Sequence, residues 1–327
     1  MRRARVKAEG EGYYHVMSRC ALQKYLLRDP EVKEMFLKIL GRAERFSGVE
    51  VANYCVMDNH FHLLVKVPKR REIDDAELDQ RILTLYGPVK SDRIFQRWKA
   101  LRAAGSSLAE DRERAAFRKR MYDISEFVKT FKQRFSLWYC RNHGNLEGTI
   151  WQGVFHSVLV EGSHDALGAV SAYISLNPVR AHMVDDAADY PWSGYGAACA
   201  GNRHAKAALL SIYFGKGSAE EKWKAYASRL EVEMVERGGD DSDMPDNGKD
   251  GKLSGARRGT MMQPRIKLEE MRRKDRNISR GIAFGSKGYV AAVIGEYCPP
   301  GRARTKPRKF GVGEGRTLLF CAGRHSA

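Results

Sequence analysis

The sequence has no apolar run of the ~18–20 residues that a membrane-spanning helix needs. Its basic start, residues 1–5, is not followed by an apolar segment, so a secretory signal is not expected. The six cysteines are scattered and form no Cys-x-x-Cys pair, which argues against a zinc ribbon and against a disulfide framework. These absences predict a cytoplasmic protein with free thiols and no membrane partner.

Acidic residues are too few to balance the basic ones. The 327 residues include 57 Lys and Arg against 40 Asp and Glu, a net charge of +17. Residues 256–327 hold 17 basic and 5 acidic residues, so this tail carries +12 of the excess. A hydrophobic fraction of 43% is enough for a packed core. A basic globular protein of this kind points first to a nucleic-acid partner, which predicts association with the nucleoid.

Composition divides the chain into a main part and a tail. Residues 238–256 are rich in Gly, Asp and Pro and lack apolar periodicity, which predicts a flexible linker. We expect 257–327 to be a basic, mostly helical DNA-binding segment. Within it, a turn at 279–286 and a helix from 287 suggest a helix-turn-helix-like unit, with a disordered basic arm as the alternative. The residues expected to grip DNA are Arg272, Arg273, Lys274, Arg276, Arg302 and Arg304.

In residues 1–237 the predicted elements alternate. Periodicity and turn residues predict strands at 13–19, 49–56, 60–67 and 148–160, and helices at 30–46, 124–139 and 165–176. Asp29 should open the first helix and Gly48 should end it, and Asp165 should cap the last. The turn at 57–59 should pair the second and third strands as an antiparallel hairpin. The order β-α-β-β-α-β-α is that of the ferredoxin-like split βαβ pattern with one more helix. Residues 201–237 read as a helical extension. The predicted class is therefore α+β, an antiparallel sheet with helices on one face.

Residues 69–121 interrupt this pattern with a long, highly charged and helical insertion. It is either a DNA-contacting element or a solvated spacer, and charge runs favour the spacer.

A pair of histidines is the sharpest local feature. Because side chains alternate along a strand, His60 and His62 should point to one face and Phe61 to the other. Two imidazoles on one face can share a divalent ion. A His-x-His pair also arises by chance, so alone it favours two structural histidines.

A second feature lies in the helix that ends near Pro178. Tyr173 and Asn177 are four residues apart and share a helix face. An amide oxygen can ligate a metal, and a phenol can act as a nucleophile. On spacing alone, a half-buried tyrosine and an ordinary helix-end asparagine are the better interpretation. Arg180 follows, either as a phosphate contact or as a partner of the helix dipole.

Together the two features fit phosphoryl transfer. A metal held by His60, His62 and Asn177 would polarise a phosphate, and Tyr173 would attack it. A covalent phosphotyrosine would conserve the bond energy, so strands could be rejoined without ATP.

Five segments occur in an order that resembles the single-tyrosine HUH transposases, and within them the REP-associated tyrosine transposases. They lie at residues 14–19, 54–65, 148–157, 173–181 and 190–195, and include Tyr-His-Val-Met-Ser-Arg, Met-Asp-Asn-His-Phe-His and Tyr-Ile-Ser-Leu-Asn-Pro. The resemblance covers roughly residues 10–200. One departure is Asp58, where the family usually has proline, a change that a turn tolerates.

The resemblance implies a catalytic domain over residues 1–200 that nicks and rejoins single-stranded hairpin DNA. It assigns Tyr173 as the nucleophile that forms a 5′-phosphotyrosine, with His60, His62 and Asn177 as ligands of Mg²⁺ or Mn²⁺. Some relatives combine the tyrosine helix of one subunit with the metal site of another, so a homodimer is one expected assembly.

Two other interpretations stay open on the sequence. A domesticated descendant would bind hairpin DNA or RNA without cleaving it, although all candidate site residues are retained here. A relaxase or replication initiator would share the chemistry, but the later segments are more similar to transposases. The aromatic residues Trp151, Phe155, Trp192 and Tyr195 either stack on unpaired bases or, more often for such residues, pack in the core.

Overall fold

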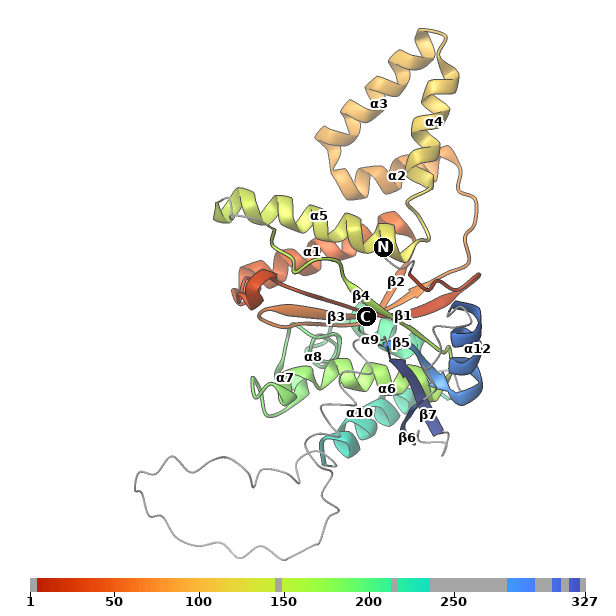
Figure 1. Cartoon of the computed structure of the whole chain (residues 1–327). Helices are drawn as coiled ribbons and strands as arrows, with labels where there is room; N and C mark the ends of the chain where they lie inside the picture. Colours follow the sequence, from red (N-terminus) through yellow and green to blue (C-terminus); the bar gives the residue numbers. More distant parts are fainter. Residues whose placement is uncertain are drawn as a thin grey trace, which may run out of the picture.

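The computed structural model of the chain describes residues 5–144, 149–212, 217–235, 281–297, 308–312 and 318–323. Its centre is a seven-stranded sheet in the order β2-β3-β1-β4-β5-β7-β6 (Figure 1). The strands are β1 (Gly12–Arg19), β2 (Glu50–Val56), β3 (His60–Val67), β4 (His156–Val160), β5 (Gly281–Ser286), β6 (Arg308–Val312) and β7 (Leu318–Gly323).

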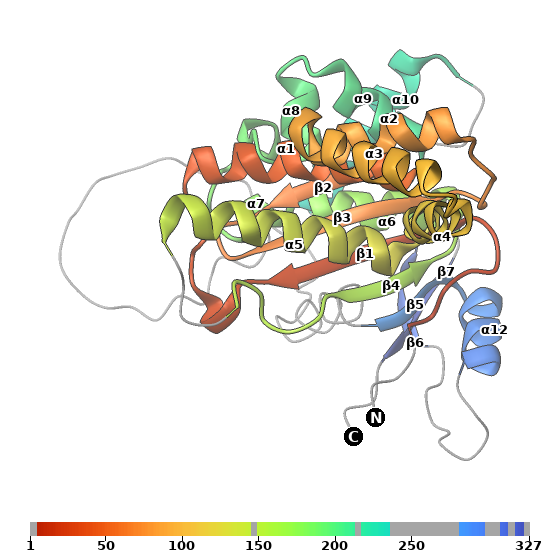
Figure 2. The ribbon, with the colours of Figure 1, turned by 90° about the horizontal axis from the view of Figure 1, so that it is seen from above.

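The first four strands have the predicted ferredoxin-like arrangement. β1 lies between β3 and β4 and pairs with both in antiparallel orientation, and β2 and β3 form the predicted hairpin. The helices α1 (Pro30–Ser47) and α5 (Ile124–His143) cross this sheet on one face (Figure 2). The α+β class is therefore confirmed.

Alternation along the central strands builds two cores. On the face of α1 and α5, Val16, Phe61 and Leu63 pack with the helix residues Phe36 and Phe131 in one buried cluster. Aromatic edges fix this packing, since the rings of Phe36 and Phe131 lie 4.7 Å apart at 83°.

The opposite face of the sheet is also covered, so the expectation of helices on one face is incomplete. Leu64 and Val158 of the sheet pack there with Leu167, Val170 and Ile174. These last three belong to α6, which lies below the sheet in Figure 1. Between β4 and residue 235 the helices are α6 (His164–Ser175), α7 (Asn177–Arg180), α8 (Gly194–Cys199), α9 (Arg203–Ser211) and α10 (Ala219–Val235), with a short 3₁₀ turn at Ala187–Asp189.

Local signals set the ends of α1 as expected. The Asp29 carboxylate accepts a hydrogen bond from the Glu31 amide, and Pro30 opens the first turn. Gly48 ends the helix at φ 71°, a left-handed conformation that glycine adopts without strain.

Two predicted boundaries near the fourth strand were wrong. β4 begins only at His156, because Gly153 turns the chain at φ 65° and Trp151 makes an isolated bridge with Cys20. The next helix is capped by Ser163, whose hydroxyl accepts from the Ala166 amide, and not by Asp165.

The charged insertion folds into three helices that project from the face of α1 and α5 (Figure 1). They are α2 (Asp75–Tyr86), α3 (Pro88–Ala103) and α4 (Ser107–Arg118). Its charges pair internally: Glu110, 2% exposed, accepts from both Arg102 and Arg114. Such pairing favours the spacer interpretation of these charges.

The carboxy-terminal segment extends the sheet. The predicted helix is present as α12 (Lys287–Tyr297), but the residues before it form strand β5, which pairs in parallel with β4. The predicted helix-turn-helix-like unit is therefore wrong, and β7 and β6 add two further strands. The linker at 238–256 lies outside the described residues.

Glu161 joins this segment to the main sheet. Its carboxylate accepts hydrogen bonds from the amide and hydroxyl of Ser286, at 2.7 and 2.9 Å, at the start of α12. A Cβ on residue 285 would lie 2.5 Å from the Glu161 Cβ, so the close approach requires glycine there. None of the helices in the described ranges is long and apolar enough to cross a membrane.

We expect Glu161→Ala to lower the free energy of unfolding by about 1–3 kcal/mol, because it removes a charged acceptor from two half-buried donors. Urea denaturation of the full chain measures this change. Glu220→Ala is the control, since Glu220 lies in an exposed ion pair with Lys206 at 3.9 Å and should change stability by less than about 0.5 kcal/mol. Equal effects of the two variants would contradict the role of Glu161.

Candidate active site

The two histidines of β3 lie on one face of the sheet, as the alternation predicted. His62 is 2% exposed and His60 is half-buried, and their ring centroids are 5.0 Å apart. Phe61 points to the opposite face, into the core under α1. The histidines therefore face α6.

Each histidine makes a hydrogen bond through Nδ1. His60 Nδ1 lies 2.7 Å from Asn59 Oδ1, and His62 Nδ1 lies 2.9 Å from Nε2 of His15. His15 comes from β1, where it is 1% exposed. Neither contact uses Nε2 of His60 or His62.

Tyr173 joins these histidines from the last turn of α6. Its ring centroid is 5.7 Å from that of His62 and 5.7 Å from that of His15, with both pairs edge to face. The tyrosine is 5% exposed. Residues that are more than 100 positions apart in the chain thus form one cluster, as the paired motifs predicted.

A buried polar network holds α6 in place. The Asn53 amide of β2 donates to the hydroxyls of Ser171 and Ser175, at 2.8 and 3.0 Å. Tyr226 of α10 contacts the same two hydroxyls at 2.9 and 2.8 Å. Because these groups are buried, each needs its partner, and the network fixes the helix that carries Tyr173.

Asn177 follows Tyr173 closely but begins a new helix. α6 ends at Ser175, and Pro178 opens α7, so the two residues do not lie on one continuous helix. Asn177 is 8% exposed and its Nδ2 donates to the backbone oxygens of Tyr173 and Ile174. Neither bond uses its carbonyl oxygen.

Two arginines supply positive charge. The Arg180 guanidinium lies 4.4 Å from the ring centroid of Tyr173, a cation–π contact. Arg19 is directly across the β1–β3 ladder from His60. Guanidinium groups suit phosphate oxygens, so this end of the sheet is fitted to an anion.

Burial keeps the histidines neutral. It lowers the pKa of His60 to about 4, with further lowering from the charges of Arg19 and Arg180. Burial also holds the pKa of His62 well below its usual value, followed by the neighbouring His60 and His15. Neutral imidazoles are the form that binds metals.

The site has part of a metal-binding set. In the described part of the chain, no three His, Cys, Asp or Glu side chains could together hold an ion. The two histidines would therefore need a ligand of another chemistry, such as an amide oxygen.

Other predicted contacts fall elsewhere. Arg272, Arg273, Lys274, Arg276, Arg302 and Arg304 lie outside the described residues. Trp151 and Phe155 are 4% and 7% exposed, and Tyr195 stacks on Trp223 with centroids 5.5 Å apart. Packing, which was the favoured interpretation of these aromatic residues, accounts for them.

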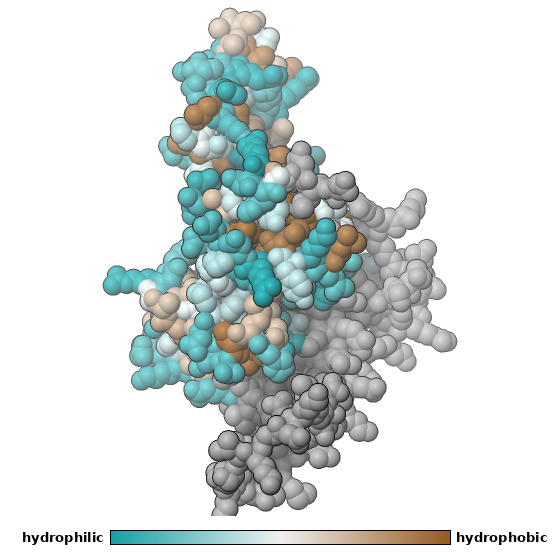
Figure 3. Space-filling view, turned by 90° about the vertical axis from the view of Figure 1, so that its left-hand side faces the viewer, coloured by the Kyte–Doolittle hydropathy of each residue, from teal (hydrophilic) through white to brown (hydrophobic). Residues whose placement is uncertain are grey.

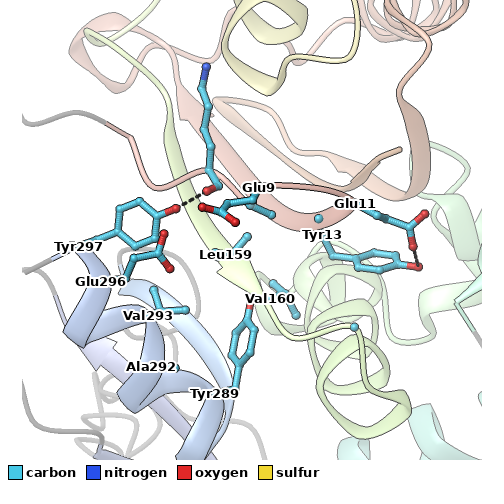
Figure 4. Close-up of a pocket in the computed structure, with 14 residues that line it drawn as sticks. Glu9, Glu11, Tyr13, Leu159, Val160, Tyr289, Ala292, Val293, Glu296 and Tyr297 are labelled. Carbon is cyan, nitrogen blue, oxygen red and sulfur yellow. Dashed lines mark hydrogen bonds between the residues drawn. The ribbon is translucent and has the colours of Figure 1, made fainter. Parts of the chain in front are cut away.

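The two ends of the sheet present different surfaces. After β1 the chain exposes Leu22 (83%) and Tyr25 (65%), and the view onto this side shows apolar residues gathered near its middle (Figure 3). The opposite end has a hollow of about 500 Å³ between β4 and α12 (Figure 4). Glu9, Glu11 and Glu296 line it, and these carboxylates would repel a phosphate backbone.

Sequence analysis missed three members of the cluster. They are His15, Asn59 and Arg19, to which the sequence patterns assigned no role in the site. The register of β1 against β3 places Arg19 opposite His60 and Met17 opposite His62. His15 is two residues before Met17 and therefore on the same face, so this register would have indicated both β1 residues.

In metal-free protein, we expect His60 to reduce stability as the pH falls from about 6.5 to about 4. The unfolded chain binds a proton on this histidine near its ordinary pKa, whereas the folded protein resists protonation to about pH 4, so acid favours unfolding in that window. Denaturant unfolding at several pH values should show a shallower loss for His60→Gln than for wild type. His204→Gln, on an exposed histidine, should keep the wild-type slope; an unchanged slope in His60→Gln would refute the expectation.

The chain is similar to known transposases in one family model and in one solved structure. Residues 10–105 match the family model described as "Transposase IS200 like". Among solved structures, the chain is similar to a REP-associated tyrosine transposase bound to a REP hairpin, with 16% identity and a TM-score of 0.37, over 66% of this chain and 93% of that one. No curated protein matches the chain.

The family match includes the two histidines of β3 and the strand β1 that supports them, but ends before Tyr173. The resemblance that the ordered motifs indicated is supported over residues 10–105, which are similar to the IS200-like transposase family.

Proposed function

We propose that the protein is a DNA transposase that nicks and rejoins single-stranded hairpin DNA through a 5′-phosphotyrosine intermediate. The observation that carries this proposal is the convergence of Tyr173, His62 and His15, with ring centroids within 5.7 Å. A phenol beside neutral imidazoles and two guanidiniums is a nucleophile next to an anion site.

In the proposed reaction Tyr173 attacks the scissile phosphorus. The new bond joins the phenol oxygen to phosphorus and the phenol proton leaves to solvent. The bond from phosphorus to the 3′ oxygen breaks, and that oxygen takes a proton from solvent. The products are a 5′-phosphotyrosine and a free 3′ hydroxyl. Attack by a 3′ hydroxyl on the phosphotyrosine reverses these changes and joins strands.

The chain's own residues have distinct tasks. Arg180 lies over the Tyr173 ring, where its charge stabilises developing phenolate and binds phosphate oxygens. Arg19 supplies a second positive charge beside His60. The network from Asn53 to Tyr226 keeps α6 seated, so that the nucleophile stays beside the histidines.

The proposed cofactor is Mg²⁺ or Mn²⁺, held by His60, His62 and Asn177. The contacts described above do not involve Nε2 of either histidine or the amide oxygen, and atoms of these kinds fit such an ion. When bound, the ion would neutralise charge on the phosphate.

We further propose that residues 1–200 are the catalytic domain, with 69–121 as an inserted spacer and 201–237 as a helical extension. The basic segment at 257–327 would add DNA affinity, and its charge of +12 supports this. DNA as the substrate would keep the protein at the nucleoid.

Tyr173→Phe should abolish a covalent protein–DNA adduct, because it removes the attacking oxygen and little else. The assay is wild-type protein with labelled single-stranded hairpin DNA from the flanks of its gene, in Mg²⁺, Mn²⁺ or EDTA, on a denaturing gel. We expect a band that requires both metal and Tyr173.

Tyr13→Phe is the matched control, since it removes a buried phenol on the same face of the sheet but outside the cluster. It should retain the adduct. Tight binding to hairpin DNA with no adduct in any metal would refute the enzyme and favour a binding protein.

A further inference from the structure

The two candidate ligands on β3 share one unusual feature: each uses the same ring nitrogen for a hydrogen bond. Asn59 Oδ1 lies 2.7 Å from Nδ1 of His60, and His15 Nε2 lies 2.9 Å from Nδ1 of His62. The partners come from different elements, a turn and a neighbouring strand. Both contacts leave Nε2 on the side of the ring away from the partner.

The Asn59 contact defines a proton position. A carbonyl oxygen can only accept a hydrogen bond, so Nδ1 of His60 must carry the proton. A neutral imidazole holds one proton, and the neutral form is the one that binds a metal. The lone pair of His60 is therefore on Nε2.

The second partner, His15, is a buried residue that lies against both His62 and Tyr173. His15 is 1% exposed on the central strand β1, and its ring lies nearly parallel to that of His62, with centroids 5.1 Å apart and an angle of 18°. It also meets the Tyr173 ring edge to face, with centroids 5.7 Å apart at 72°. His15 thus contacts the ligand and the nucleophile and has little room to move.

We propose that Asn59 and His15 are positioning residues that hold His60 and His62 as the Nδ1–H tautomers and direct both Nε2 lone pairs to one ion. The bound metal in this proposal rests on the proposed function, whereas the tautomers do not depend on it. In it, His62 Nδ1 donates to Nε2 of His15, which carries its own proton on Nδ1.

This arrangement answers a physical need. A neutral histidine that lacks such a partner can place its proton on either nitrogen and rotate about its side-chain bonds. A divalent ion needs two lone pairs fixed in direction at once. Loss of a partner that orients a metal-binding histidine typically weakens metal binding by about 10–100-fold.

The first test measures tautomers in metal-free wild-type protein. With ¹⁵N-labelled histidine, two-bond couplings between ring nitrogens and carbon-bound protons show which nitrogen carries the proton. We expect His60 and His62 to be protonated on Nδ1 at pH 7. A proton on Nε2 of either residue would overturn the proposal, whether or not the protein cleaves DNA.

The second test measures Mn²⁺ affinity by calorimetry in full-length variants. His15→Phe keeps the ring but removes the acceptor, and should weaken Mn²⁺ binding by about 10–100-fold. His15→Gln supplies an oxygen acceptor and should recover part of the affinity. Asn59→Leu should weaken binding, and Asn59→Asp, which keeps an acceptor, should preserve it.

Val158→Ala is the matched control for disturbance of the core. Val158 is 1% exposed and lies opposite His15 in the β1–β4 ladder, but its side chain is apolar and cannot form a hydrogen bond with a histidine. It should lower stability and leave Mn²⁺ affinity unchanged. Wild-type affinity in folded His15→Phe, or an equal loss in Val158→Ala, would overturn the proposal.

The two tests separate the positioning role from the proposed function. If wild-type protein binds no Mn²⁺ and forms no DNA adduct, the function fails, while the tautomers still decide the role of the partners. If wild type binds Mn²⁺ and cleaves but His15→Phe and Asn59→Leu do the same at equal affinity, only the positioning proposal fails.

Discussion

The antiparallel register of β1 against β3 is the constraint on which the rest of the site depends. It places Arg19 opposite His60 and Met17 opposite His62, while alternation sends Phe61 and Leu63 into the other core. A slip of one residue would turn both histidines into the aromatic cluster of α1 and α5 and expose phenylalanine to the nucleophile. Burial of those apolar side chains therefore also aims the polar ones.

The second requirement is that α6 stay fixed against that strand. Its contacts with the sheet are partly polar, through Asn53 and the hydroxyls of Ser171 and Ser175. A buried network of this kind has directional bonds, so it specifies one position of the helix where apolar packing alone would tolerate small shifts. Buried hydrogen bonds thus hold the helix that carries the nucleophile, and apolar packing holds the strand that carries the histidines.

Local patterns in the sequence predicted much of this arrangement. Alternation in β3, the cap at Asp29 and the ordered motifs identified the hairpin, α1, the histidine pair and Tyr173. The contact of His15 with His62 could not be predicted locally, because it depends on the pairing of β1 with β3. β5 was read as a turn, since its two glycines mark turns locally and only its distant partner β4 makes it a strand.

The parallel pairing of β5 with β4 has a consequence for how the chain acquires its structure. From Val160 to Gly281 the ribosome must add the whole intervening segment before the partner of β4 exists. The four-stranded unit with the histidine cluster can form earlier, because its pairings are all upstream. Closing so long a loop is entropically costly, so we expect β5 to cover the β4 edge only after the four-stranded unit has formed. Until then the nascent protein presents an open strand edge to its neighbours.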